Sequence, residues 1–264
     1  PPLAASDEAA ADPIVALPLL AFGAAAAPGL PLKAAPQVPL MPRVPDEQAG
    51  SRWSGDAWLL ARDDSDAPRA RGAPSSGPTQ VGGVVRSALA PGSDLRPTAH
   101  LRVSAPLSGA RDREAAVGLS GRPLPLPVRV VAEARLSETD GGTHVRPALY
   151  AVTELPPLTL PSKVQGEAYL QGGYVGGEFT TGFIDGQARI ERELVSAGKI
   201  AVTAGAGVWG GVQEGASRID IGPSAAASFR VGAMRGRVAA DYRFRIAGTA
   251  EPASGPALTV SAGF

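Results

Sequence analysis

Apolar and polar residues alternate along the last thirty residues of the chain. From Arg237 to Ile246 every second residue is apolar, and the residues between them include three arginines and one aspartate. After a polar break from Gly248 to Pro256 the alternation resumes, with one apolar face made of Leu258, Val260, Ala262 and Phe264. Successive side chains of a strand point to opposite faces, so the pattern predicts a two-stranded hairpin with one apolar and one polar surface.

The same alternation of apolar and polar residues extends back to Ser51, with Gly, Pro, Asp and Ser between the alternating segments. It predicts strands near residues 52–62, 80–90, 97–106, 112–121, 127–137, 143–154, 163–175, 179–192, 198–210, 217–231, 234–246 and 256–264. Twelve is an even number, as in single-chain bacterial barrels. An even count also places both ends of the barrel on one side of a membrane.

The polarity of the two faces favours a barrel over a soluble sandwich. The apolar face is rich in Ala, Val and Leu, whereas a sandwich core needs large residues to reach crystal-like density. The opposite face carries charged and amide groups on strand after strand. We therefore predict an all-β, transmembrane, antiparallel up-and-down β-barrel over residues 51–264. Interfacial aromatic girdles are expected to include Trp53, Tyr150, Tyr174, Phe179, Trp209, Tyr242, Phe244 and Phe264.

Residues 1–50 have a different composition, with ten prolines among the first 45 positions and many alanines. Proline at this density blocks helix interiors and sheet ladders alike, so we expect a disordered linker or tail. An alternative is a linker to an upstream periplasmic domain. The chain begins with Pro1, and we expect it to be a processed form or a fragment.

Overall composition removes several classes of function. The net charge is +0 and the pI about 7.3, so no basic stripe for nucleic acid is expected. Cysteine is absent, which excludes thiol chemistry, thiolate zinc sites and disulfides. No window approaches the roughly 18 apolar residues of a spanning helix, so a membrane form of this chain has to be a barrel. No cofactor or metal ligand set is expected.

Four glycine- and aromatic-rich segments carry a family resemblance: Gly166–Gly177 (GEAYLQGGYVGG), Asp185–Arg189 (DGQAR), Gly205–Gly211 (GAGVWGG) and Arg237–Gly248 (RVAADYRFRIAG). Together they resemble the C-terminal outer-membrane barrel of certain alphaproteobacterial proteins. They are more distantly similar to the barrels of cellulose-secretion porins and of a phage-adsorption outer-membrane protein. The resemblance implies an upstream periplasmic helical-repeat domain as a partner and the export or display of a polysaccharide.

The resemblance also implies a place and an assembly route. It predicts a bacterial outer-membrane location, with lipid around the barrel and both termini in the periplasm. The terminal strand, with Leu258, Val260, Ala262 and Phe264, resembles the signal that the barrel assembly machinery reads.

The polar face is expected to line the lumen, with eleven arginines against nine acidic residues. Guanidinium groups bind carboxylates bidentately, so one interpretation is a conduit for an acidic or highly hydroxylated polymer. The candidate contacts are Arg129, Arg135, Arg189, Arg230, Arg237, Arg243 and Arg245. The other interpretation is that arginines and acids pair across strands and fill a narrow lumen.

Enzymatic chemistry depends on the two histidines, His100 and His144. A hydrolase needs a nucleophile and an orienting group around one of them, and neither neighbourhood forms a recognisable motif. We therefore expect no catalytic residues. Three functions stay open. The first is passage or export of a hydrophilic solute, with a polysaccharide as the expected solute. The second is a plugged structural, adhesion or phage-receptor barrel, and the third is a barrel hydrolase.

Overall fold

The computed structural model describes residues 51–62, 79–107, 113–139, 142–177, 180–250 and 253–264, and they form strands and turns. The strands are β1 (Trp53–Arg62), β2 (Gln80–Ala88), β3 (Thr98–Pro106), β4 (Arg113–Gly121), β5 (Val128–Thr139), β6 (Gly142–Thr153), β7 (Leu158–Leu160), β8 (Val164–Val175), β9 (Thr181–Ala197), β10 (Ile200–Gln213), β11 (Ala216–Val231), β12 (Met234–Gly248) and β13 (Gly255–Gly263). These residues contain no helix long and apolar enough to cross a membrane.

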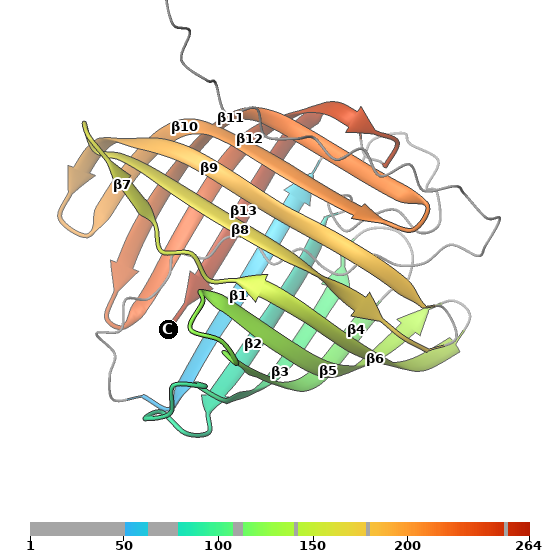
Figure 1. Ribbon diagram of the computed structural model, residues 1–264. Coiled ribbons are helices and arrows are strands. Elements are labelled where there is room, and N and C mark those ends of the chain that lie inside the picture. Colours follow the sequence, from blue (N-terminus) through green and yellow to red (C-terminus); the bar gives the residue numbers. More distant parts are fainter. Residues whose placement is uncertain (1–50, 63–78, 108–112, 140–141, 178–179, 251–252) are drawn as a thin grey trace, which may run out of the picture.

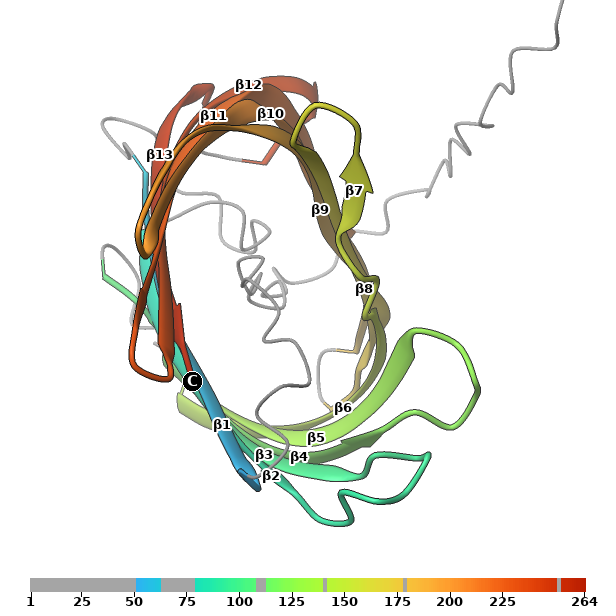
Figure 2. The same cartoon turned by 90° about the vertical axis from the view of Figure 1, so that its left-hand side faces the viewer.

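Neighbouring strands pair antiparallel around a closed ring (Figures 1 and 2). The first and last strands meet, with Asp56 to Arg62 of β1 paired to Ala257 to Gly263 of β13. The ring closes on the other side where Ala148 to Val152 of β6 pair with Gln171 to Val175 of β8. Twelve strands form this wall, which confirms the predicted antiparallel up-and-down barrel.

The thirteenth strand, β7, was not expected from the sequence. It pairs only with the start of β8, on the same edge that β6 uses further along. Pro156 and Pro157 lie between β6 and β7 and have no N–H to donate, so they interrupt the ladder. In the gap, the Leu170 N–H donates to Thr153 Oγ1 at 2.9 Å. β7 thus continues the line of β6 along β8.

The distribution of side chains matches the predicted polarity. Large apolar residues are exposed on the outer face, among them Leu101, Val117, Leu149, Ile184 and Leu258. The buried positions alternate with them and carry charges on most strands, as in Arg102, Glu133, Arg189 and Asp241. Apolar residues outside and charges within are the arrangement of a transmembrane barrel.

The predicted girdle position is wrong for two aromatic residues. Tyr150 and Trp209 point into the barrel, where Trp209 is 1% exposed. Trp209 has the same parity as Gln213 on β10, and the exposed Val208 and Val212 have the opposite one. Five other expected members are exposed: Trp53, Tyr174, Tyr242, Phe244 and Phe264. Phe179 and the expected tail over residues 1–50 lie outside the described residues.

Candidate functional site on the interior wall

Small residues on the inner face let long side chains lie flat along the wall. Arg237 of β12 reaches Glu191 of β9, with an Nη2–Oε1 distance of 2.5 Å, although β10 and β11 lie between them. The inward positions that it crosses include Ala226 on β11 and Thr203 on β10. The interior is therefore lined by a layer of side chains in mutual contact. Some of these contacts join strands that are not direct neighbours in the sheet.

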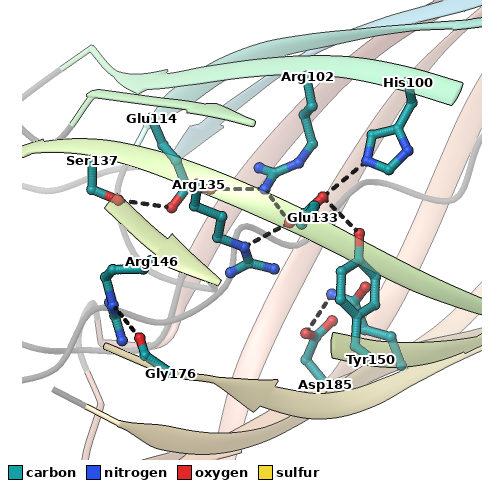
Figure 3. Close-up of polar contacts among 11 residues, drawn as sticks. His100, Arg102, Glu114, Glu133, Arg135, Ser137, Arg146, Tyr150, Gly176 and Asp185 are labelled. Carbon is teal, nitrogen blue, oxygen red and sulfur yellow. Dashed lines mark hydrogen bonds and ion pairs between the residues drawn. The ribbon is translucent and has the colours of Figure 1, made fainter. Parts of the chain in front are cut away.

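One network is centred on Glu133 of β5 (Figure 3). The Glu133 carboxylate is fully buried and is contacted by four donors. Arg135 Nε and Arg102 Nη2 donate to Oε1 at 2.6 and 2.9 Å, and Tyr150 Oη donates to Oε2 at 3.2 Å. His100 Nε2 lies 3.0 Å from the same Oε2. These donors keep the buried carboxylate compensated.

The same network extends along the wall on both sides of Glu133. Arg102 Nη2 also donates to Glu114 Oε1 at 2.8 Å, and the Ser137 hydroxyl donates to Glu114 Oε2 at 3.3 Å. The Arg135 guanidinium lies over the rings of Tyr150 and Phe183, 5.6 and 5.8 Å from their centres. This adds a cation–π contribution to the ion pair.

A second network surrounds Trp209 of β10. Arg243 and Arg189 lie 4.5 and 5.8 Å from the centre of the indole ring. Both arginines also reach Asp241 Oδ2, Arg243 at 3.3 Å and Arg189 at 3.8 Å. The indole therefore lies beside two guanidinium groups that share one carboxylate.

A third cluster lies near the end of the barrel opposite the start of β1 and the C-terminus. Asp220 is 0% exposed and accepts two bonds from Arg218 Nε, at 2.7 and 2.8 Å. Arg62 Nη1 is 3.6 Å from the same carboxylate. Arg218 and Arg245 both donate to the Ala250 carbonyl oxygen, at 2.9 and 3.0 Å. This cluster ties the start of the β12–β13 connection to the wall.

At the end that carries the start of β1 and the C-terminus, Glu154 lies just after β6 and holds two arginines. Arg129 Nε donates to Glu154 Oε1 at 2.9 Å, and Arg122 donates to the other oxygen. Partial burial acts to raise the pKa of Glu154, but the two guanidinium groups outweigh it, and the pKa lies below the usual range. Arg129 also donates to Arg96 O at 3.1 Å, which joins the β2–β3 turn to this rim.

The structure brings most of the candidate arginines into ion pairs. Each of five has an acidic partner: Arg129 with Glu154, Arg135 with Glu133, Arg189 and Arg243 with Asp241, and Arg237 with Glu191. Arg245 donates to a backbone oxygen, and Arg230 is exposed near the β11–β12 turn. Their contact with a solute stays a prediction. The pattern follows the second interpretation of the polar face, in which charges pair across strands.

Sequence reasoning missed three residues of this wall. Arg218 is 1% exposed but was not among the inward arginines, and Tyr150 and Trp209 were placed in a girdle. Parity could have found them; Arg218, for example, alternates with the apolar Ile219 and Ile221.

The two histidines, on which the hydrolase alternative depends, lie on different strands, β3 and β6. His100 is hydrogen-bonded to Glu133, and His144 pairs in register with Ser137 across β5 and β6. The Ser137 hydroxyl, however, donates to Glu114. Within the described ranges, no group of three or more His, Asp or Glu residues is placed to hold a metal ion. A hydrolase stays an untested alternative.

No family model and no curated protein matches this chain. Its fold is similar to that of LpxR from Salmonella typhimurium, with 8% identity, coverage of 80% of this chain and 99% of that chain, and a TM-score of 0.45. The NanC porin gives 8% identity, 80% and 98% coverage and a TM-score of 0.39. A bacterial polysaccharide outer membrane secretin gives 6% identity, 80% and 96% coverage and a TM-score of 0.40. At these scores, function has to be argued from the residues of this chain.

Proposed function

We propose that this chain is a bacterial outer-membrane β-barrel for the passage or export of a hydrophilic solute, and that the solute is a polysaccharide. The observation that carries the proposal is the opposition of the two faces of one closed wall. Val117, 61% exposed, and Leu119, 58% exposed, lie outside on β4, while Glu114 of the same strand is buried inside. Closure satisfies the backbone within the ring, as a barrel in lipid requires.

Lipid is the proposed partner of the outer face. Burying one large aliphatic side chain away from water is worth about 1.5–3 kcal/mol, and exposed Leu, Val and Ile residues cover this face on every side of the ring. The last strand supports the proposed assembly signal, since Leu258 is exposed and Val260 and Ala262 share its outward parity. In this proposal the termini and the Glu154 rim face the periplasm.

The interior supports a hydrophilic solute, because its surface is made of guanidinium, carboxylate and amide groups. A polysaccharide presents hydroxyl groups that exchange hydrogen bonds with such a wall. A dense layer of ion pairs also favours the second candidate, a plugged barrel that acts as a structural or adhesion protein. The bridges of Arg237 to Glu191 and of Arg62 to Asp220, each over two intervening strands, are the observation behind this alternative.

Conductance in planar lipid bilayers separates the two candidates. An open lumen gives discrete current steps, whereas a plugged barrel gives none under the same voltage. If steps are seen, the reversal potential in a salt gradient measures ion preference. Arg245→Glu should shift this preference towards cations, because it reverses a half-buried charge on the inner face. Arg192→Glu, on the exposed outward side of β9, is the matched control and should leave the reversal potential unchanged.

A further inference from the structure

Four buried N–H groups on the wall formed by β9, β10 and β12 have no hydrogen-bond acceptor within the described part of the chain. They are Nε of Arg189, Arg237 and Arg243 and Nε1 of Trp209. Their side chains belong to residues that are between 1% and 8% exposed. Other such atoms are spread over the wall, among them Nε1 of Trp58 and Nη1 of Arg102. An N–H that loses water without gaining an acceptor destabilises the folded state, so four such groups on side chains linked by contacts indicate a further partner.

These donors belong to one cluster of contacts. Arg189 and Arg243 lie beside the Trp209 ring and share Asp241. The Ser224 hydroxyl lies 2.7 Å from Asp241 Oδ1 and 3.2 Å from Glu191 Oε1, and Glu191 accepts from Arg237. We call these residues the Trp209 cluster: Arg189, Glu191, Trp209, Ser224, Arg237, Asp241 and Arg243.

The cluster is close to electrically balanced. Its three guanidinium groups face the carboxylates of Glu191 and Asp241, and Glu167 lies directly opposite Arg189 in the β8–β9 ladder. The arginines therefore have countercharges, and what they lack is acceptor atoms. An acidic ligand would add a negative charge without compensation inside the wall. The hydroxyl and ring oxygens of a neutral sugar accept hydrogen bonds without adding charge.

We propose that the Trp209 cluster is a binding site for neutral sugar residues on the interior wall. The site rests on the proposed function, in which the lumen carries a hydrophilic solute, and it narrows the solute to a neutral polysaccharide. Sugar oxygens take the positions of the missing acceptors, and the indole N–H and the guanidinium Nε–H groups orient the sugar. The ion pairs with Asp241 and Glu191 hold the arginines in place for this task.

Tryptophan fluorescence of the protein refolded in detergent micelles tests the site without requiring conduction. The probes are maltohexaose, a neutral oligosaccharide, and an oligogalacturonate of the same length, which carries carboxylates. We expect a saturable change of emission with maltohexaose that is absent in Trp209→Phe. Trp53→Phe is the matched control, because Trp53 is 59% exposed at the start of β1, and this variant should keep the response.

A second pair of variants tests the donors themselves. Arg243→Lys and Arg189→Lys keep a positive charge near Asp241 but remove the Nε–H group. Each should raise the dissociation constant for maltohexaose about tenfold, the effect of losing one hydrogen bond from a charged group. Arg192→Lys, on the outward side of β9, should leave it unchanged. The shift between heated and unheated bands in gel electrophoresis verifies that every variant is folded.

The outcomes separate this site from the proposed function, since bilayer conductance is measured on the same preparation. Current steps without a maltohexaose response support the proposed conduit and overturn the sugar site at the Trp209 cluster. A saturable response without current steps supports the site and overturns the conduit. A response that persists in Trp209→Phe, or that is stronger with oligogalacturonate, overturns the assignment to neutral sugars.

Discussion

At the scale of single residues, the interior wall consists of charges that are buried and compensated. Asp220 and the Glu133 carboxylate are inaccessible to solvent, and each is in contact with at least two guanidinium groups. Replacing a buried ion pair by apolar residues is often neutral, whereas removing one member leaves the other without a partner. The effect of a substitution on this wall therefore depends on which partners it leaves behind.

Glu133→Gln tests this dependence. The neutral amide leaves Arg102 and Arg135 with one countercharge fewer, and we expect the free energy of unfolding to fall by about 3–5 kcal/mol. Urea unfolding of the protein in lipid vesicles, followed by fluorescence, measures the change. Glu193→Gln is the control, because Glu193 pairs with Lys163, whose side chain is 74% exposed, and such a pair is worth about 0–1 kcal/mol. Equal losses in the two variants would contradict the assigned role of Glu133.

Two adjacent glycines of β2 give a second matched pair. A Cβ on Gly82 would lie 2.3 Å from the ring of the buried Trp58, whereas a Cβ on Gly83 would lie 3.4 Å from its nearest neighbour, Asp56 O. Gly82→Ala should destabilise the barrel by about 1–3 kcal/mol through forced movement of the indole. Gly83→Ala should change stability by less than about 0.5 kcal/mol. Heat denaturation in detergent measures the difference. Equal midpoints for the two variants would contradict the packing of Trp58 on Gly82.

At the scale of elements, one turn and one strand end depend on a single carboxylate. Glu154 follows β6 and holds Arg122 and Arg129, and Arg129 in turn contacts the turn before β3 through Arg96 O. The connection from β6 to β7 carries two prolines and few ladder bonds, so this rim relies on side chains.

The lowered pKa of Glu154 predicts that the stability of the barrel depends on pH in the acid range. Because the folded pKa lies below the ordinary value of 4.5, the ionised carboxylate stabilises the fold above pH 4.5. This contribution is lost as the pH falls through the folded pKa. The midpoint of heat denaturation, measured from pH 7 to pH 3, should fall more steeply for the natural protein than for Glu154→Gln. Parallel curves for the two proteins would show that Glu154 contributes nothing to the acid sensitivity.

At the scale of the whole molecule, the closed wall puts its apolar residues on the outside, and this belt is predicted to contact lipid. Val117 lies at the middle of β4 and is 61% exposed. Val117→Arg should destabilise the barrel in vesicles by about 2–4 kcal/mol, the effect of a lipid-facing arginine near the bilayer midplane. Val117→Leu should change stability little. Urea titration of both variants in phospholipid vesicles measures the difference, and an unaffected Val117→Arg would contradict a membrane position for β4.

Much of the fold could be predicted because the side chains of a strand alternate between two faces, which gives the sequence a period of two residues. The alternation over residues 127–137 and 217–231 located β5 and β11 within two residues of their ends. The short β7 could not be predicted, because the prolines before it give a loop signal and its pairing depends on the position of β8. The inner face could be predicted from parity, and Tyr150 and Trp209 were misplaced because aromatic type was given more weight than parity.

The sequence alone determined the twelve strands of the wall, their two unlike faces and the even count that lets a single chain close on itself, because these follow from a local two-residue period. Only the tertiary structure decided which arginine meets which carboxylate. Arg237 and Glu191 are far apart in the chain and on strands that are not neighbours, so their contact exists only once β9, β10, β11 and β12 have paired side by side. For the same reason, a count of eleven arginines and nine acids could not distinguish a charged track from a compensated wall.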